Sequence, residues 1–211
     1  MELTVFGATG GTGRLVVEQA LAAGHDVTAV VRDRARLPVP DQERLHVAVG
    51  PVTDRPAVLA AVTGANAVVD ALGANDTGPT SIRVDAARVI VPAMREAGVT
   101  RLVVVSAAGF HTTGDGPFVR WGVKPVLGRF LRHSFADMAA MEKIVRASGL
   151  DWTIVLPPRL TNGPRTGRFR SAVDRSVRGS FSITRADLAD AVLQAVTDDR
   201  LRHAEFSVAA A

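Results

Sequence analysis

The feature that most constrains this chain is a glycine-rich stretch close to its start. Gly7, Gly10 and Gly13 follow the apolar run of residues 3–6 and introduce a segment with helical spacing. Glycine lets a strand turn sharply into a helix, and the unpaired N–H groups at a helix N-terminus attract phosphate. The first two glycines stand one residue further apart than in the G-x-G-x-x-G dinucleotide fingerprint, so a flexible strand-to-helix connection is the alternative. We favour a diphosphate site, with predicted contacts from Gly7, Thr9, Gly10, Gly11, Thr12 and Gly13.

Strand-like and helix-like segments alternate along the rest of the chain. The apolar runs are nearly continuous in Val, Ala and Leu, which is typical of strands covered on both faces. Alternation of this kind indicates βαβ units with right-handed crossovers. The sequence therefore predicts an α/β fold, a doubly wound parallel sheet between two helix layers, in a single domain over residues 1–211. The predicted strands are residues 3–6, 27–31, 45–49, 67–72, 102–105, 152–156 and 205–208, and the predicted helices are residues 11–23, 55–62, 81–97, 134–147 and 185–197.

The composition narrows the possible classes of function. The chain has no cysteine, which excludes disulfides, thiolate nucleophiles and thiolate metal sites, and its five histidines are too scattered to predict a metal site. No apolar stretch approaches about 18 residues and no basic-then-apolar leader opens the chain, so we expect no membrane partner and a cytoplasmic location. The net charge of +4 comes from arginines interleaved with acids, which favours a solvated surface over nucleic-acid binding.

The residues after the second predicted strand bear on the choice of dinucleotide. Arg32 is the first polar residue there, with Arg34 and Arg36 close behind. Arginine neutralises the 2′-phosphate of NADP, whereas an acid would bind the ribose hydroxyls of NAD. Asp33 complicates this pattern, because it could reach a ribose or repel the phosphate. We predict that the chain binds NADP(H) in preference to NAD(H), with plain surface arginines as the alternative.

Two connections are longer than a minimal βα loop. Residues 107–133 carry several glycines and prolines among apolar and basic residues, and residues 157–180 form a second excursion. Long loops in compact domains are usually functional lids or disordered segments. The apolar content favours a lid or substrate wall, with room for one short helix in the first connection and an edge strand at residues 167–173. Together the two connections would form a small substrate-covering lobe.

Several of these segments resemble the atypical short-chain dehydrogenase/reductase group. Within it the chain is similar to the NAD(P)H-binding family that includes biliverdin-IXβ reductase (flavin reductase) and the NmrA-like proteins. The most specific segments are residues 6–13 (FGATGGTG) and residues 148–161 (SGLDWTIVLPPRLT). The similarity spans nearly the whole chain, with shorter matches at residues 31–33, 36–37, 71–73 and 106–107.

The resemblance implies a Rossmann-like domain that binds NADPH, with Arg32 at the 2′-phosphate. It also implies that Ser106 lies near the nicotinamide and that the proline pair after the sixth strand borders the same pocket. Family members usually have Gly-Asp after the third strand, where this chain has Gly50-Pro51. A contact with adenine would therefore come from backbone, from Val52 or Thr53, or be absent. Beyond the glycine turn, the expected cofactor contacts are Arg32, Asp33, Arg36, Val52, Leu72, Gly73, Ser106, Ala107, Pro157 and Pro158.

The chain contains no tyrosine, which removes the Tyr-x-x-x-Lys pair used by reductases of the larger short-chain family. Hydride transfer is cofactor chemistry, so an electron-poor flavin, quinone or linear tetrapyrrole can take hydride directly, with its proton from water. The predicted catalytic residues are Ser106, which would position nicotinamide or acceptor, and His111, the best-placed titratable acid, with a plain surface loop histidine as the alternative for His111. A basic wall for a planar or anionic small-molecule substrate is predicted from Lys124, Arg129, Arg132 and Arg159.

The preferred function is therefore an NADPH-dependent oxidoreductase for a flavin-like, quinone-like, tetrapyrrole or specialised small-molecule acceptor. Two alternatives stay open at this point. One is an NmrA-like redox sensor that binds NADP(H) with little catalysis, and the other is a reductase or isomerase of a biosynthetic pathway. A monomer or weak homodimer is expected in each case.

Overall fold

A mostly parallel β-sheet forms the centre of the protein. The structure, a computed structural model, describes residues 1–73, 80–108 and 124–211, with the side chains of residues 124–133 outside the description. The strands of the sheet are β1 (Glu2–Phe6), β2 (Asp26–Val31), β3 (Leu45–Val49), β4 (Ala67–Asp70), β5 (Arg101–Val105), β6 (Asp151–Leu156), β8 (Phe169–Val173) and β10 (Ala204–Ala210). Their order is β3-β2-β1-β4-β5-β6-β10-β8, and only β8 runs antiparallel to its neighbour.

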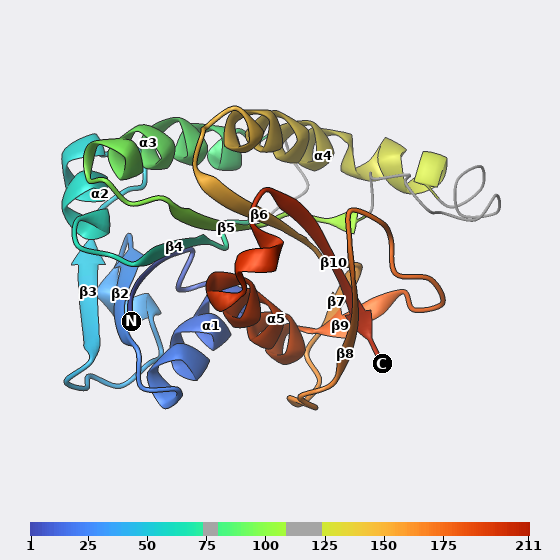
Figure 1. Ribbon diagram of the computed structural model, residues 1–211, viewed down its shortest axis with the longest axis horizontal. Helices are drawn as coiled ribbons and strands as arrows, with labels where there is room; N and C mark the ends of the chain where they lie inside the picture. Colours follow the sequence, from blue (N-terminus) through green and yellow to red (C-terminus); the bar gives the residue numbers. More distant parts are fainter. Residues whose placement is uncertain (74–79, 109–123) are drawn as a thin grey trace.

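Helices cover both faces of this sheet. They are α1 (Gly11–Ala22), α2 (Arg55–Val62), α3 (Ile82–Glu96), α4 (Lys124–Arg146) and α5 (Arg185–Thr197). Helices α1 and α5 pack on one face, and α2, α3 and α4 pack on the other (Figure 1). Strand β1 contributes side chains to the cores on both faces of the sheet. Leu3 and Val5 lie in the core with α1 and α5, and Phe6 lies in the opposite core. The predicted Rossmann-like, three-layer α/β fold is confirmed.

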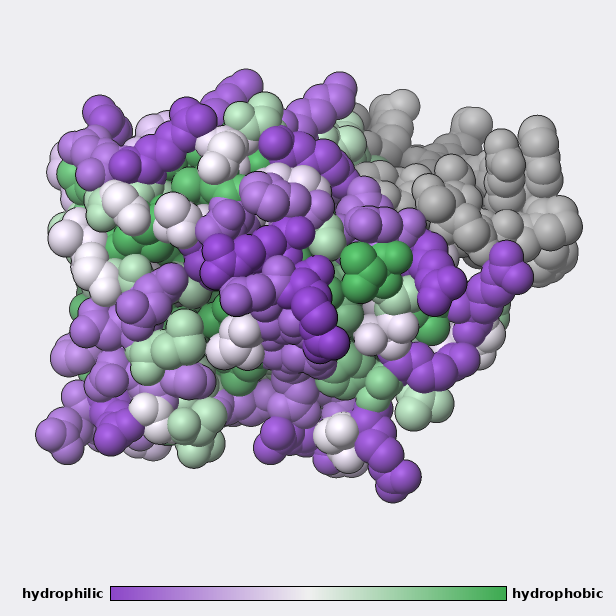
Figure 2. Space-filling model, in the orientation of Figure 1, coloured by the Kyte–Doolittle hydropathy of each residue, from purple (hydrophilic) through white to green (hydrophobic). Residues whose placement is uncertain are grey.

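Shorter elements complete the fold. The 3-10 helices η1 (Arg34–Arg36) and η4 (Asp199–Leu201) follow β2 and α5. Strands β7 (Arg159–Thr161) and β9 (Ser182–Thr184) form a second, parallel sheet of two strands within the predicted 157–180 excursion and just beyond it. The edge strand expected within residues 167–173 is confirmed as β8, which pairs with β10. On the face seen in Figure 2, hydrophilic residues dominate the surface.

Several predicted boundaries were wrong, most of them by one or two residues, and two of the differences have a clear physical reason. The helix expected at residues 134–147 begins at Lys124, so the last ten residues of the predicted loop 107–133 are helical. Pro125 was an argument for a loop, but the first turn of a helix accepts proline because its missing N–H has no partner there. The fourth strand ends at Asp70 instead of residue 72. The Asp70 carboxylate accepts a hydrogen bond from the Leu72 N–H at 3.0 Å, which turns the chain out of the sheet.

The strand order positions the candidate site. The chain runs from β1 outward to β2 and β3 and then crosses back to β4 on the other side of β1, so the strand order reverses between β1 and β4. In open α/β sheets, ligands bind beyond the carboxyl ends of the strands at such a reversal. Within the described ranges, no helix is both long and apolar enough to cross a membrane.

Candidate active site

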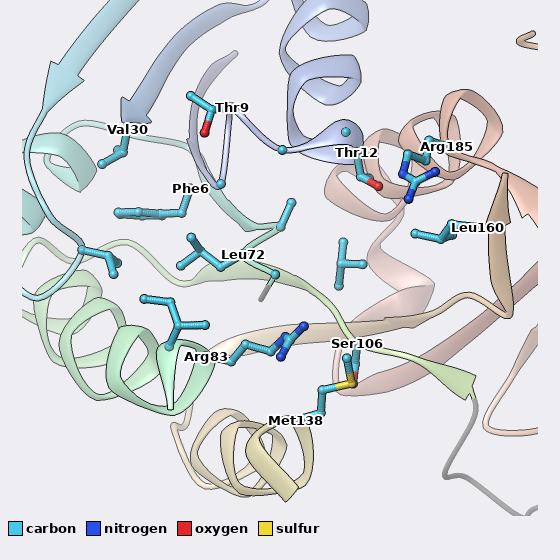
Figure 3. A pocket seen from close by; sticks show the side chains of 18 of the residues that line it. Phe6, Thr9, Thr12, Val30, Leu72, Arg83, Ser106, Met138, Leu160 and Arg185 are labelled. Atoms are coloured by element: carbon cyan, nitrogen blue, oxygen red, sulfur yellow. The ribbon is translucent and has the colours of Figure 1, made fainter. Parts of the chain in front are cut away.

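A cavity of 670 Å³ lies at the carboxyl edge of the sheet, where the strand order reverses. Its volume is within the range of small-molecule and cofactor sites. Segments that follow β1, β2, β3, β4, β5 and β6 all line it, together with the first residues of α3 and α5 (Figure 3). Of the predicted site residues, those that line it are Gly7, Thr9, Gly10, Gly11, Thr12, Arg32, Arg36, Val52, Leu72, Gly73, Ser106, Ala107, Pro157 and Pro158.

The glycine turn forms one wall of the cavity, and its geometry requires glycine. Gly7 has a φ of +75°, and a Cβ there would lie 2.6 Å from the Ala71 carbonyl oxygen. A Cβ on Gly13 would collide with the carbonyl oxygen of Gly7. Gly13 therefore permits the close packing of α1 against β1 and does not line the cavity itself. The turn is closed by a hydrogen bond from the Gly10 N–H to the Gly7 carbonyl at 2.9 Å.

The N-terminus of α1 differs from the other N-termini with described caps. Gly10 provides no side-chain cap, and the first turn of α1 holds no acid. In α2 and α5, by contrast, Asp54 and Thr184 accept from backbone N–H groups. Asp137 of α4 accepts from the backbone N–H groups of the first turn of α3 at 3.1 and 3.2 Å. Helix α1 thus leaves its N–H groups and positive dipole end to the cavity, which suits a diphosphate.

Two cations lie at the end of the cavity beyond β2. Arg32 and Arg36 line it, and among the described residues neither has an ion-pair partner. The neighbouring groups are occupied elsewhere. The Asp33 carboxylate caps η1 by accepting from the Ala35 N–H at 2.9 Å, and Arg34 donates to the Leu37 and Val39 carbonyls and to Asp41. The acid that complicated the sequence pattern therefore serves the local backbone and is not among the lining residues.

The opposite end of the cavity combines a buried hydroxyl, a thioether and a guanidinium. Ser106 follows β5 directly and lies near Met138 and Arg83 in Figure 3. The Ser106 hydroxyl donates to the Glu142 carboxylate of α4 at 2.6 Å. Arg83 is held by its Nη1, which donates to Asp137 at 3.3 Å and to Ser134 at 3.4 Å. Both described hydrogen bonds of the guanidinium use this one nitrogen, so its other edge is available to a ligand.

A buried acid stands just behind this end. Asp70, the last residue of β4, is 5% exposed. Burial raises its pKa to about 6, against the opposing effects of the Leu72 N–H and the Arg83 charge. Asp70 does not line the cavity, but it helps set the charge environment of Arg83.

Some of the predicted site residues do not line the cavity or lie outside the described part of the chain. Gly13, Asp33 and Arg159 lie outside the lining of the cavity, and Arg159 is an exposed residue at the start of β7. His111 lies outside the described residues, as do the side chains of Lys124, Arg129 and Arg132. The described residues contain no group of three potential metal ligands.

Sequence reasoning missed two of the four arginines that line the cavity, Arg83 and Arg185. Arg83 lies in the first turn of α3, and Arg185 is the first residue of α5 and donates to Asn162 at 2.5 Å. A cation at a helix N-terminus is unfavourable beside the positive end of the helix dipole. An arginine at the start of a predicted helix could therefore have indicated an anion site. The signal is not specific, because Arg55 begins α2 in the same way and pairs with Glu96. No sequence pattern marked Glu142 as a site residue, because it is far from Ser106 in the sequence and contacts it only in the folded protein.

The fold and the cavity define a Rossmann-like protein that binds a dinucleotide. A family model described as NAD(P)H-binding matches residues 7–199. This chain belongs to that NAD(P)H-binding family and is an NAD(P)H-dependent oxidoreductase, which confirms the resemblance inferred from residues 6–13 and 148–161.

Individual relatives show how far the similarity extends. The chain is 34% identical over 186 residues to a 3-diazoavenalumate denitrifying reductase of Streptomyces sp, covering 81% of this chain and 59% of that protein. It matches the structure of ChuY, an anaerobillin reductase of Escherichia coli O157:H7, with a TM-score of 0.78 and 25% identity over 99% of this chain and 97% of that one. A short-chain dehydrogenase/reductase of Veillonella parvula in complex with NADP matches with a TM-score of 0.80 and 21% identity, covering 99% and 94%.

Proposed function

We propose that this protein is an NADPH-dependent reductase of a planar or anionic small molecule of the flavin, quinone or tetrapyrrole kind. The observation that carries the proposal is the layout of one cavity, which Arg32 and Arg36 line after β2, the glycine turn lines after β1, and Ser106 lines after β5. This layout fits a dinucleotide that lies across the strand-order reversal.

Each part of the cavity fits one part of NADPH. The uncapped N-terminus of α1, with Thr12 beside it, suits the diphosphate. Arg32 and Arg36 suit the 2′-phosphate. Val52 and Leu72 offer apolar surface for the adenine in place of the acid that the family usually has. Ser106, Ala107 and the prolines Pro157 and Pro158 would border the nicotinamide.

The acceptor would lie at the Ser106 end, among Met138, Leu160, Arg83 and Arg185. When bound, NADPH supplies the hydride, and the protein positions the two reactants and stabilises charge. Met138 and Leu160 suit the flat apolar face of a conjugated acceptor, and the two guanidinium groups suit anionic substituents. Two similar proteins are reductases of small molecules, an anaerobillin reductase and a 3-diazoavenalumate denitrifying reductase, which supports the reduction of a small molecule here.

The cofactor part is tested by titrating NADPH and NADH into the wild type and Arg32→Ala. We expect a preference for NADPH of at least about tenfold, roughly 1.4 kcal/mol, that is mostly lost in the variant. Arg88→Ala is the matched control, because it also removes one exposed arginine but lies on α3 in a pair with Asp85. Equal affinities for NADPH and NADH in the wild type would refute the proposed preference.

The acceptor part is tested by following the absorbance of reduced nicotinamide with a panel of flavins and quinones. Turnover of at least one member supports a reductase. Tight NADPH binding without turnover across the panel would overturn the acceptor class and favour the redox-sensor alternative.

A further inference from the structure

The hydroxyl of Ser106 begins a chain of polar groups that leads away from the cavity. Its Oγ donates to Oε1 of Glu142 at 2.6 Å, and both residues are buried, at 5% and 2% exposure. The other carboxylate oxygen of Glu142 accepts from Nη1 of Arg146 at 2.9 Å, one helical turn further along α4. Glu142 is thus bound on one side by the cavity hydroxyl and on the other by a cation.

The position of Arg146 is itself fixed by the sheet. Its Nη2 pairs with Glu205 of β10 at 2.6 Å, and its guanidinium lies 5.8 Å from the ring centroid of Trp152 in β6. Glu142 therefore meets a guanidinium that two strands hold in place, and the pair stabilises the ionised carboxylate.

An ionised carboxylate can only accept hydrogen bonds, and a serine hydroxyl has one hydrogen to donate. The hydrogen of Ser106 is therefore committed to Glu142. Within the described ranges, no protein donor is bonded to the Ser106 Oγ. What Ser106 offers to the cavity is a pair of acceptor sites, and a ligand group that lacks an N–H or O–H leaves them unpaired.

We propose that Glu142 is a positioning residue that holds Ser106 as a hydrogen-bond acceptor, so that the ligand group beside Ser106 must carry an N–H or O–H donor. This inference rests on the proposed function and deepens it. Two ligands have suitable donors, namely the carboxamide of the nicotinamide ring and an acceptor substrate with a ring N–H. In either case the proton that accompanies hydride comes from another source, because the Ser106 hydrogen is engaged with Glu142.

Glu142→Gln tests the direction of the hydrogen bond between Ser106 and residue 142. The glutamine oxygen can still accept from Arg146, while its NH₂ group donates to Ser106 and frees the serine hydrogen to donate into the cavity. Ser106→Ala removes the group altogether. The matched control is Glu18→Gln, which makes the same change in another Arg–Glu pair at i,i+4 spacing, Arg14–Glu18 on α1 at 2.6 Å.

In the first arm, dissociation constants are measured for NADPH and for its reduced 3-acetylpyridine analogue, whose methyl ketone has no N–H. In the second, KM is measured for lumiflavin and for its N3-methyl derivative. We expect the wild type and Glu18→Gln to disfavour the ligand without the donor by about tenfold in one of the arms. Glu142→Gln and Ser106→Ala should both narrow that ratio to within about threefold.

The ligand pair whose ratio of Kd or KM changes in the variants identifies the ligand that faces Ser106, either the nicotinamide or the acceptor. An unchanged ratio in both arms for either variant would overturn the inference while leaving the proposed function intact. Should Glu142→Gln fail to fold, Ser106→Ala decides alone, because loss of the discrimination is required there too. Failure of the wild type to bind NADPH would instead overturn the proposed function, and this inference with it.

Discussion

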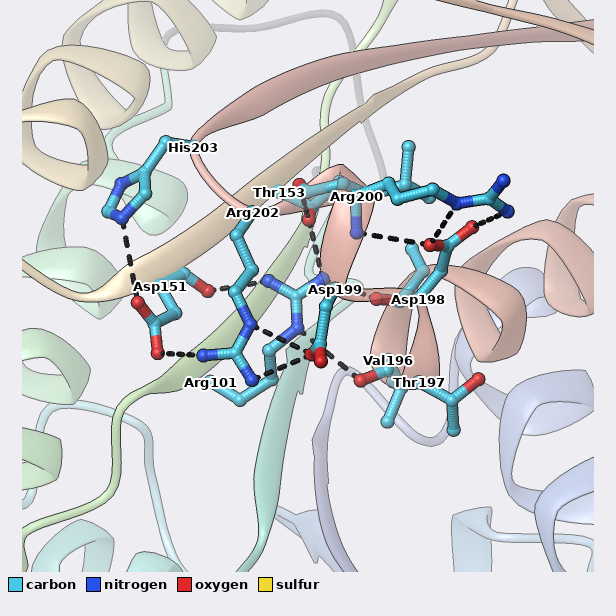
Figure 4. A network of polar contacts seen from close by, with 12 residues as sticks. Arg101, Asp151, Thr153, Val196, Thr197, Asp198, Asp199, Arg200, Arg202 and His203 are labelled. Atoms are coloured by element: carbon cyan, nitrogen blue, oxygen red, sulfur yellow. Dashed lines mark hydrogen bonds and ion pairs between the residues drawn. The ribbon is translucent and has the colours of Figure 1, made fainter.

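Two buried arginines lie at opposite edges of the sheet, Arg101 at the amino end of β5 and Arg83 of α3 beside the cavity at the carboxyl edge, and they are used in opposite ways. At the amino end, Arg101 donates to the carbonyls of Asp151, Ala195 and Val196 and to the Thr153 hydroxyl (Figure 4). Near the carboxyl edge, the Arg83 guanidinium makes its hydrogen bonds to described residues through Nη1, and Arg83 lines the cavity.

The difference shows how one sheet separates stability from function. The Arg101 guanidinium joins β5, β6 and the end of α5, where helix carbonyls have no partners within the helix. Each of its three guanidinium nitrogens donates to a protein acceptor. The carboxyl edge instead has the 670 Å³ cavity, a helix N-terminus without a side-chain cap, and an Arg83 guanidinium whose bonds to described residues use one nitrogen. In open α/β sheets, this is the edge where ligands bind.

The largest expected effect is on stability, at the amino end. Arg101→Met should lower the free energy of unfolding by about 4 kcal/mol, because it leaves several buried carbonyls without a donor. The NADPH affinity of the folded protein should stay within about twofold of the wild type. Urea unfolding and cofactor titration measure the two quantities, with exposed Arg200→Met as the control. A stable variant with impaired cofactor binding would reverse the roles assigned to the two ends.

The second largest expected effect is at Gly7. Comparing it with Gly98 separates the cost of a positive φ from the cost of a Cβ that meets neighbouring backbone. Gly7 and Gly98 have φ values of +75° and +71°, but a Cβ on Gly98 would meet nothing within 4 Å. Gly98→Ala should therefore cost about 1 kcal/mol of stability and leave cofactor binding unchanged. Gly7→Ala should cost about 3 kcal/mol and weaken NADPH binding at least about tenfold, because the turn must move away from Ala71. Similar results for both variants would show that strain alone matters at Gly7.

The third expected effect is a pH dependence of stability that arises from Asp70, at the carboxyl end of β4. Burial raises the pKa of Asp70 to about 6, above the ordinary value of 3.8. The folded state therefore binds the Asp70 proton more tightly than the unfolded state does, and stability falls as the pH rises from about 4 to 6. Asp70→Asn keeps an oxygen for the Leu72 N–H and abolishes this titration. Unfolding measurements should find the variant more stable than the wild type by about 3 kcal/mol at pH 7 and no more stable at pH 3.5. A constant difference across this range would contradict the raised pKa.

The smallest expected effect concerns the free edge of Arg83. Arg83→Gln should raise KM for an anionic quinone, 1,4-naphthoquinone-2-sulfonate, by about tenfold. KM for the neutral quinone menadione should change by less than about twofold. Equal changes for both quinones would mean that Arg83 acts only through its contacts with Asp137 and Ser134.

Much of this arrangement could be predicted from the sequence, because it depends on local patterns. Alternating apolar runs and helical segments predicted the parallel sheet, and the position of the glycine turn and Arg32 after β1 and β2 predicted one part of the cavity wall. The contacts that complete the other end are long-range. Ser106 and Glu142 are 36 residues apart, and Arg83 and Asp137 are 54 apart. No local pattern identifies such pairs, since they depend on the way α3 and α4 pack on β5 and each other.

A crystal structure of the NADPH complex tests the division between the two ends most directly. We predict a diphosphate against Gly10, Gly11 and Thr12, a 2′-phosphate bonded to Arg32 or Arg36, and a nicotinamide beside Ser106, with the Arg101 contacts unchanged. A dinucleotide bound outside this cavity, or a 2′-phosphate remote from both Arg32 and Arg36, would contradict it.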